Sequence, residues 1–146
     1  MKVTIGSDHG GHELKRPIID HFTSKKLSFI DVGIHNKWES ADYPLYAAYV
    51  AEEISTNKAD KGILVCGTGI GMSIAANKFK GIRAALVHDV FSAKATREHN
   101  DSNILCIGQR VIGEEVALMI VDMWLSTEFE GGRHQKRIDL ISKYES

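Results

Sequence analysis

The chain lacks a strong charge of either sign and lacks a long apolar run. The 18 lysines and arginines nearly balance the 19 aspartates and glutamates, which leaves a net charge of −1 over 146 residues. Such a chain has no broad electrostatic attraction to nucleic acid or to a membrane surface. No apolar segment approaches the ~18 residues of a membrane span, and no secretory signal pattern follows Met1. We therefore expect a cytoplasmic protein that binds neither nucleic acid nor membrane.

Cysteine and proline are also scarce, with two residues of each. Cys66 and Cys106 both end apolar runs, and the metal-binding spacings Cys-x-x-Cys and His-Glu-x-x-His do not occur. A chain of this length can bury roughly two-thirds of its unfolded surface without a disulfide or a structural metal. The sequence therefore predicts two reduced thiols and no metal site.

Short apolar runs of strand character alternate with longer helical segments along the whole chain. The expected strands are Lys2–Ser7, Ser28–Val32, Gly62–Cys66, Ile82–Val87 and Asn103–Ile107. The expected helices begin near Gly11, Pro44, Ile70, Phe91, Gly113 and Arg133. This alternation is typical of parallel strands joined by right-handed crossovers. It predicts one domain over residues 1–146, a doubly wound, Rossmann-like α/β/α sandwich with a five-stranded parallel sheet. Its C-terminal helix, about residues 133–144, would pack on the domain or on a partner subunit.

Polar residues follow every expected strand, where ligands bind in open sheets of this kind. These residues are Asp8, His9 and Gly10, then Asp42 and Tyr43, then Cys66–Gly71, then His88 and Asp89, and finally Gly108, Gln109 and Arg110. Because the carboxyl ends of parallel strands share one edge, we expect a site there.

The most informative of these segments is Cys66-Gly67-Thr68-Gly69-Ile70-Gly71. It would place a thiol and a hydroxyl in a glycine-rich turn whose backbone N–H groups point at an anion. Cys66 could equally be a small buried hydrophobic residue, but amide groups around it would favour a thiolate. A dinucleotide site is a further alternative, because Asp89 lies 20 residues beyond Gly69. Against it, the glycine spacing differs and the turn follows the third strand rather than the first.

Arg133 and Arg137 lie four residues apart at the start of the last expected helix, so they would share one face. Two guanidinium groups at a helix start suit a phosphate. The alternative is a solvated basic face. His99, at the end of another helical segment, could transfer protons or merely complement the helix dipole.

Five segments in this order resemble the ribose-5-phosphate isomerase type B family and the related galactose-6-phosphate isomerase subunits. The segments are Gly6–Gly11, Asp42–Pro44, Cys66–Lys78, Arg97–Asp101 and Glu130–Gln135. The resemblance implies an isomerase of the pentose phosphate pathway that needs no cofactor and no metal. It also implies a homodimer or tetramer in which each site contains residues from two subunits.

In that family pattern Cys66 is the base that moves a proton between C2 and C1 of an open-chain aldose phosphate, with Thr68 beside it. The amides of Gly67–Gly71 would hold the enediolate oxygen. His99, helped by Asp8, would open the sugar ring. A branch of the family has a glutamate base where this chain has Met72, so the chain resembles the cysteine branch.

The resemblance also assigns the substrate contacts. His9, Arg133 and Arg137 would bind the phosphate, and Arg110 and Asn100 would come from across the subunit interface. The full set of implied substrate-binding residues is His9, Tyr43, Gly67, Gly69, Ile70, Gly71, Ser73, Asn100, Arg110, Arg133 and Arg137.

The expected reaction interconverts D-ribose 5-phosphate and D-ribulose 5-phosphate. Allose 6-phosphate, galactose 6-phosphate and tetrose phosphates are alternative substrates, because all of them suit a phosphate clamp and an enediolate hole. The contrasting class is a non-catalytic module that binds a nucleotide or phosphorylated ligand on the same turn and does not need Cys66.

Overall fold

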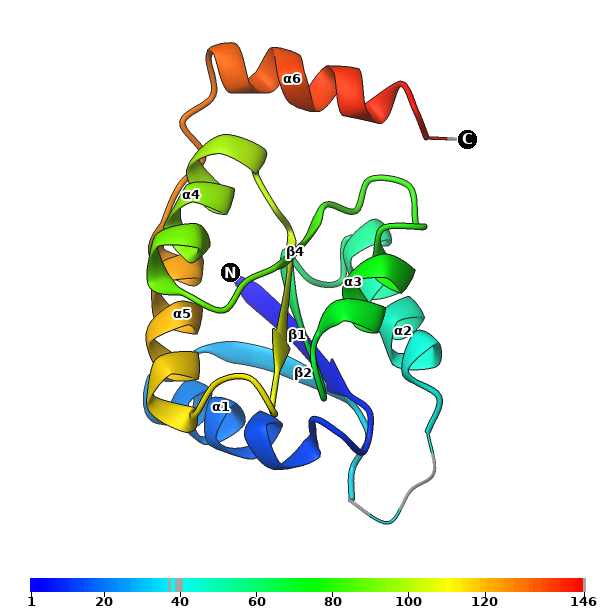
Figure 1. Ribbon diagram of the computed structural model, residues 1–146, viewed down its shortest axis with the longest axis vertical. Helices are drawn as coiled ribbons and strands as arrows, with labels where there is room; N and C mark the ends of the chain where they lie inside the picture. The colour runs from blue at the N-terminus through cyan, green and yellow to red at the C-terminus, as the bar shows by residue number, and fades with distance from the viewer. Residues whose placement is uncertain (37, 39–40, 146) are drawn as a thin grey trace.

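The computed structural model describes residues 1–36, 38 and 41–145 and confirms the alternation of strands and helices (Figure 1). The elements, in chain order, are β1 (Lys2–Ser7), α1 (His12–Ser24), β2 (Ser28–Gly33), α2 (Tyr43–Ser55), β3 (Lys61–Cys66), α3 (Ile70–Ala76), β4 (Ala84–Leu86), α4 (Val90–Asn100), β5 (Ile104–Gly108), α5 (Glu114–Ser126) and α6 (Arg133–Ser142). Each predicted boundary, including the end of α6 at Ser142, lies within two residues of the observed one.

The fourth strand is shorter than predicted, three residues instead of the six from Ile82 to Val87. The reason is that the backbone amides of its first two predicted residues form hydrogen bonds outside the sheet. The Ile82 amide donates to the Phe79 carbonyl in a turn, and the Arg83 amide donates to Asn103 Oδ1 at 2.8 Å. Only Ala84–Leu86 pairs with β5.

All five strands are parallel, in the order β2-β1-β3-β5-β4. The chain passes from β1 to β2 on one side and then crosses to β3 on the other, so the switch point lies between β1 and β3. Asp8 follows β1 and Cys66 ends β3. The fold therefore places these two side chains next to each other at the edge where ligands bind.

Helices cover both faces of the sheet (Figure 1). On one face α1, α4 and α5 bury an apolar cluster that includes Ile18, Phe22 and Trp124. On the other face α2 and α3 bury a smaller cluster around Val50 and Met72. Each fully buried side chain of this size contributes about 1.5–3 kcal/mol relative to an exposed one. The three-layer sandwich of the sequence prediction is confirmed.

The two outer strands are irregular. β4 has only three residues. The register between β1 and β2 shifts at Ile5 and Gly6, and β2 carries Asp31, whose Oδ1 pairs with the buried Lys15 Nζ at 2.8 Å. Neither edge of the sheet presents a long regular ladder.

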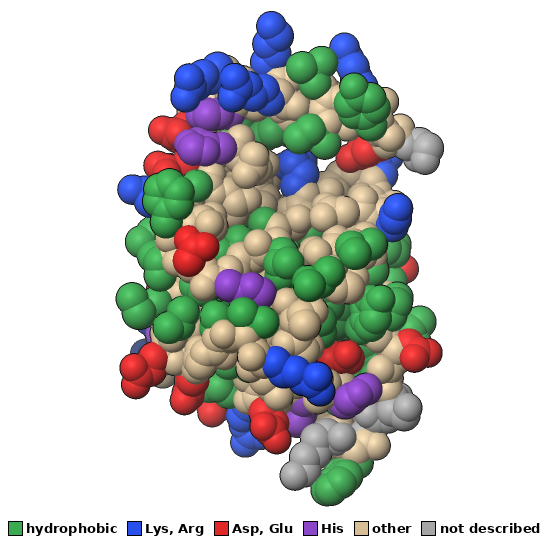
Figure 2. Space-filling model, viewed as in Figure 1, with side chains coloured by type: hydrophobic (Ala, Val, Ile, Leu, Met, Phe, Trp, Pro, Cys, Tyr) green, Lys and Arg blue, Asp and Glu red, His purple; other side chains and the backbone are tan. Residues whose placement is uncertain are grey.

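The last helix, α6, lies apart from the two helical layers, across the end of the molecule (Figure 1). It contacts α4 and buries His134 and Ile138. Leu140, Ile141 and Tyr144 remain exposed. Between α6 and the body lies a hollow of about 600 Å³, lined in part by Asn100, Ile141 and Tyr144 and visible in Figure 2. Within the described part of the chain, no helix has both the length and the apolar character needed to cross a membrane.

Candidate active site

The turn after β3 holds the side chains of Cys66 and Thr68 with one backbone N–H donor each. The Gly69 amide donates to Cys66 Sγ at 3.0 Å, and the Ile70 amide donates to Thr68 Oγ1 at 3.2 Å. Gly69 has a left-handed φ of 80°, and a Cβ there would lie 2.7 Å from Leu86 Cδ1, so only glycine fits. An amide that donates to sulfur stabilises negative charge on it. The turn therefore gives the Cys66 sulfur a hydrogen-bond donor that the backbone holds in place.

The loop after β1 packs directly on this turn. A Cβ built on Gly10 would lie 3.2 Å from the Gly67 nitrogen and 3.2 Å from Asp8 Oδ1. Asp8 is 9% exposed, and its Oδ1 has no hydrogen-bond partner in the described part of the chain. His9 is exposed beside it. A buried, unpartnered carboxylate oxygen is unusual in a folded protein, and a role in catalysis is one explanation for it.

Tyr43 and Arg110 border the turn on two further sides. The Tyr43 ring lies on Gly71, where a Cβ would approach it to 2.6 Å. The Arg110 side chain lies over Gly67, with Cδ and Nε each 3.7 Å from a Cβ built there. The Arg110 amide also donates to the Gly67 carbonyl at 3.0 Å. Within one chain, Arg110 therefore packs against the Cys66 turn.

The helix α4 carries His99 away from Cys66. It begins at the carboxyl edge of the sheet, where Asp89 caps it, and runs back toward the strand starts (Figure 1). His99 precedes β5, which starts at Ile104, whereas Cys66 pairs with Gly108 at the end of β5. The strand between these levels spans four residue steps, roughly 13 Å. One chain therefore holds the two predicted catalytic side chains at opposite ends of its parallel strands, His99 near the amino ends and Cys66 at the carboxyl ends.

The other residues predicted near His99 follow the same division. Asn100 ends α4 and lines the hollow beneath α6, and Arg133 and Arg137 are exposed on α6. We call these four residues the His99 group. The Cys66 group, at the carboxyl edge, comprises Asp8, His9, Tyr43, Cys66, Gly67, Thr68, Gly69, Ile70, Gly71, Ser73 and Arg110. Each group is assembled within the chain, but the chain does not bring the two groups together.

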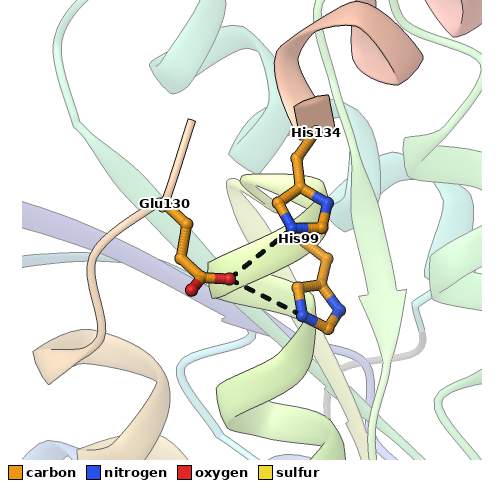
Figure 3. Close-up of side chains that lie close together, drawn as sticks. All are labelled: His99, Glu130 and His134. Atoms are coloured by element: carbon orange, nitrogen blue, oxygen red, sulfur yellow. Dashed lines mark ion pairs between the residues drawn. The ribbon is translucent and has the colours of Figure 1, made fainter. Parts of the chain in front are cut away.

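Two side chains that the sequence analysis left unassigned, Glu130 and His134, surround His99 (Figure 3). Glu130 Oε1 lies 3.7 Å from His99 Nε2 and 3.6 Å from His134 Nε2. The ligand atoms of the three residues lie within 4.8 Å of one another, a separation at which a metal ion could be held. However, the two imidazole rings are stacked, with centroids 4.6 Å apart and an interplanar angle of 22°. Their lone pairs therefore lie in two separate, nearly parallel planes, whereas the lone pairs of two ligands of one ion must converge on one point.

His88 supports the end of β5 beside the Cys66 turn. The Gly108 amide donates to His88 Nε2 at 2.9 Å, so the ring must be unprotonated at that nitrogen. Burial lowers the pKa of His88, and the neighbouring Asp89 carboxylate opposes that shift only in part. The neutral ring therefore stabilises the folded state.

A lowered pKa predicts how stability depends on pH. The contribution of neutral His88 is fully present above the ordinary histidine pKa of about 6.5 and is lost as the pH falls below it, because the unfolded chain then binds more protons. Urea unfolding at pH 7.5 and pH 5.5 should show a loss of stability that is smaller in His88→Gln than in the native protein. Equal losses in both proteins would contradict this role.

The chain is similar in sequence and in fold to known sugar phosphate isomerases. Residues 3–141 match the sequence profile of the Ribose/Galactose Isomerase family. The putative sugar phosphate isomerase YwlF of Bacillus subtilis is 57% identical over 99% of this chain and 97% of its own length. The structure of ribose-5-phosphate isomerase B from Clostridium thermocellum has a TM-score of 0.96 and 51% identity, covering 98% of this chain and 96% of that one. Ribose-5-phosphate isomerase B from Mycoplasma genitalium, solved with bound ribulose-5-phosphate, has a TM-score of 0.93 and 42% identity, covering 98% of this chain and 95% of that one. A family profile that matches nearly the whole chain, together with relatives that share its fold and about half its residues, shows that the chain belongs to the ribose/galactose isomerase family.

Proposed function

We propose that the protein interconverts ribose 5-phosphate and ribulose 5-phosphate, with Cys66 as the base. The observation that carries this proposal is the amide of Gly69, which donates to Cys66 Sγ at 3.0 Å. The Mycoplasma genitalium relative, which binds ribulose-5-phosphate, supports the choice of substrate. An aldose–ketose isomerisation requires a proton carrier and a cradle for negative charge, and the Cys66 turn offers both.

In the proposed reaction the Cys66 thiolate removes the proton from C2 of the open-chain aldose. The C2–H electron pair forms the C1–C2 double bond, and the carbonyl electrons move to O1, which gives an enediolate. The proton on O2 passes to O1, with Thr68 beside the path. The Cys66 thiol then returns its proton to C1 as the C2 carbonyl forms, so nothing is oxidised or consumed overall.

The amides of Gly67–Gly71 would hold the charged oxygen of the enediolate. Donors that are fixed before the reaction need no reorganisation when the charge appears, and loss of one such donor typically costs ~10²–10³ in rate. Arg110, which lies over Gly67, adds a positive charge to the same side of the turn. The turn therefore favours the intermediate over the neutral sugar.

We further propose that a second copy of the chain completes the site. The His99 group would open the sugar ring and bind the phosphate, but in one chain it lies at the opposite edge of the sheet from Cys66. In a twofold dimer the contact is reciprocal, so each copy supplies a Cys66 group to one site and a His99 group to the other. Exposed apolar side chains border both groups, Ile70 and Ile74 on α3 and Leu140 and Ile141 on α6. Such a contact would cover them.

The test is an assay of purified protein with four-, five- and six-carbon aldose phosphates, each with and without a chelator. We expect the highest kcat/KM with ribose 5-phosphate and the same rate with the chelator. A higher kcat/KM with allose 6-phosphate, galactose 6-phosphate or a tetrose phosphate would identify that sugar as the substrate, and the proposed type of reaction would stand. Ligand binding without conversion of any sugar phosphate would overturn the proposal in favour of a binding module.

A further inference from the structure

We propose that Glu130 and His134 are positioning residues that hold the imidazole of His99 in the orientation and tautomer needed for ring opening. This inference rests on the proposed function, because it takes His99 to be the group that opens the sugar ring. It concerns two residues, Glu130 and His134, that have no role in the family resemblance or in the reaction proposed above.

The first support is the arrangement of the three side chains (Figure 3). The same carboxylate oxygen, Glu130 Oε1, faces the Nε2 atoms of His99 and His134 at 3.7 and 3.6 Å. The His134 ring stacks on the His99 ring with centroids 4.6 Å apart. The side chain of His134 is only 10% exposed, whereas that of His99 is 48% exposed. A fixed, buried ring thus supports a ring that solvent and a ligand can reach.

The second support is the backbone, which holds Glu130 and His134 next to His99. The Glu130 amide donates to the Glu98 carbonyl at 3.1 Å, immediately before His99. The chain then turns through Gly131 and Gly132, with φ values of 70° and 57°. Apart from its own chain neighbours, no atom of the described residues lies within 4 Å of a Cβ at either glycine, so backbone conformation rather than crowding favours glycine there. The turn starts α6 and brings His134 back over His99.

The chemistry follows from the position of the carboxylate. A carboxylate at Nε2 favours the tautomer with the proton on Nε2, which leaves Nδ1 of His99 free to accept a proton. In ring opening, Nδ1 takes the proton of the C1 hydroxyl, the C1 carbonyl forms, the C1–O4 bond breaks, and the imidazolium returns a proton to O4. Glu130, which is half exposed, would also stabilise the imidazolium while it exists, in the orienting role that the carboxylate has in a catalytic triad. The proposal requires the separations of 3.6 and 3.7 Å to shorten to hydrogen bonds when the ligand binds, and catalytic hydrogen bonds are often long before that step.

Two measurements on the same protein separate ring opening from the proton transfer at carbon. The first is the rate from ribose 5-phosphate, which is mostly a furanose and must open. The second is exchange of the C1 hydrogen of ribulose 5-phosphate with D2O, followed by NMR. Ribulose 5-phosphate is acyclic because the hydroxyl that would close its furanose ring carries the phosphate. The exchange therefore requires Cys66 but no ring opening.

We expect Glu130→Gln to lower kcat for ribose 5-phosphate by about 10–100-fold, the usual effect of losing a group that orients a functional histidine. The C1 exchange of ribulose 5-phosphate should stay within about twofold of native. Glu128→Gln, a matched change at an exposed carboxylate two residues away, should leave both rates native. His134→Phe, which keeps a stacked ring, should lose less ring-opening activity than His134→Ala.

Equal losses in both measurements for Glu130→Gln would overturn the proposal, because they would indicate a general structural or phosphate-binding role. So would native rates in both, or an equal effect of Glu128→Gln. Circular dichroism and thermal unfolding of each variant identify any that fails to fold. Failure of the proposed function itself is a different result, since the native protein would then show neither isomerisation nor C1 exchange.

Discussion

Cys66→Ala is expected to lower the conversion of ribose 5-phosphate by at least about 10³-fold, because positioned proton transfer typically contributes 10²–10⁴ and the second thiol, Cys106, is fully buried in β5. Removing the side chain leaves the glycine amides, Tyr43 and Arg110 in place, so the affinity for a sugar phosphate should change little. Activity is measured by the coupled formation of ribulose 5-phosphate, and affinity by calorimetry.

Cys106→Ala is the matched control. Cys106 is fully buried in β5, and burial, with a smaller effect of the nearby Cys66, raises the pKa of its thiol. We expect native activity and a loss of about 1 kcal/mol in stability, the usual size for a core substitution. Turnover that survives in Cys66→Ala, or that disappears in Cys106→Ala, would contradict the assignment of the base.

Two inactive variants are expected to restore each other's activity when combined in one dimer. Cys66→Ala removes a residue of the Cys66 group, and the double change Arg133→Ala with Arg137→Ala removes the phosphate contacts of the His99 group. In a mixed dimer, one of the two shared sites carries all the changes and the other carries none. Dimers purified by two different affinity tags should therefore recover about half of the native activity, far above either parent.

The control is a doubly tagged dimer in which both chains carry Cys66→Ala, which should stay inactive. A mixed dimer that also stays inactive would show that each site is built from one chain. In that arrangement every site contains at least one changed residue.

The layers of the fold and the position of the Cys66 group follow from sequence patterns. Parallel strands bring their carboxyl ends to one edge, so Asp8 and the Cys66 turn could be placed together before any coordinates. The length of β4 could not, because Asn77 and Asn103 supply side-chain partners to the backbone around Ala84, and no local pattern signals such contacts. The insertion of β5 between β3 and β4 is likewise a product of long-range packing.

The position of His99 relative to Cys66 could have been predicted from the sequence. A helix that starts at the carboxyl edge of a sheet and runs 11 residues, about 16 Å, must end near the opposite edge. Glu130 and His134 gave a weaker signal, an acid and a histidine four residues apart. Their contact with His99, some 30 residues earlier, depends on the left-handed turn at Gly131 and Gly132. The sequence Gly131-Gly132 predicts a turn before a helix, but it does not predict the direction in which that helix runs.

The irregular outer strands limit how copies of this protein can associate. Many sheet proteins are at risk of edge-to-edge aggregation, in which an exposed strand recruits a strand from another molecule. Here β4 is too short to template such pairing, and β2 combines a register shift with the charge of Asp31. These features disfavour extension of the sheet from one copy into the next. Association is directed to helices and turns, which are the surfaces that carry the two halves of the proposed site.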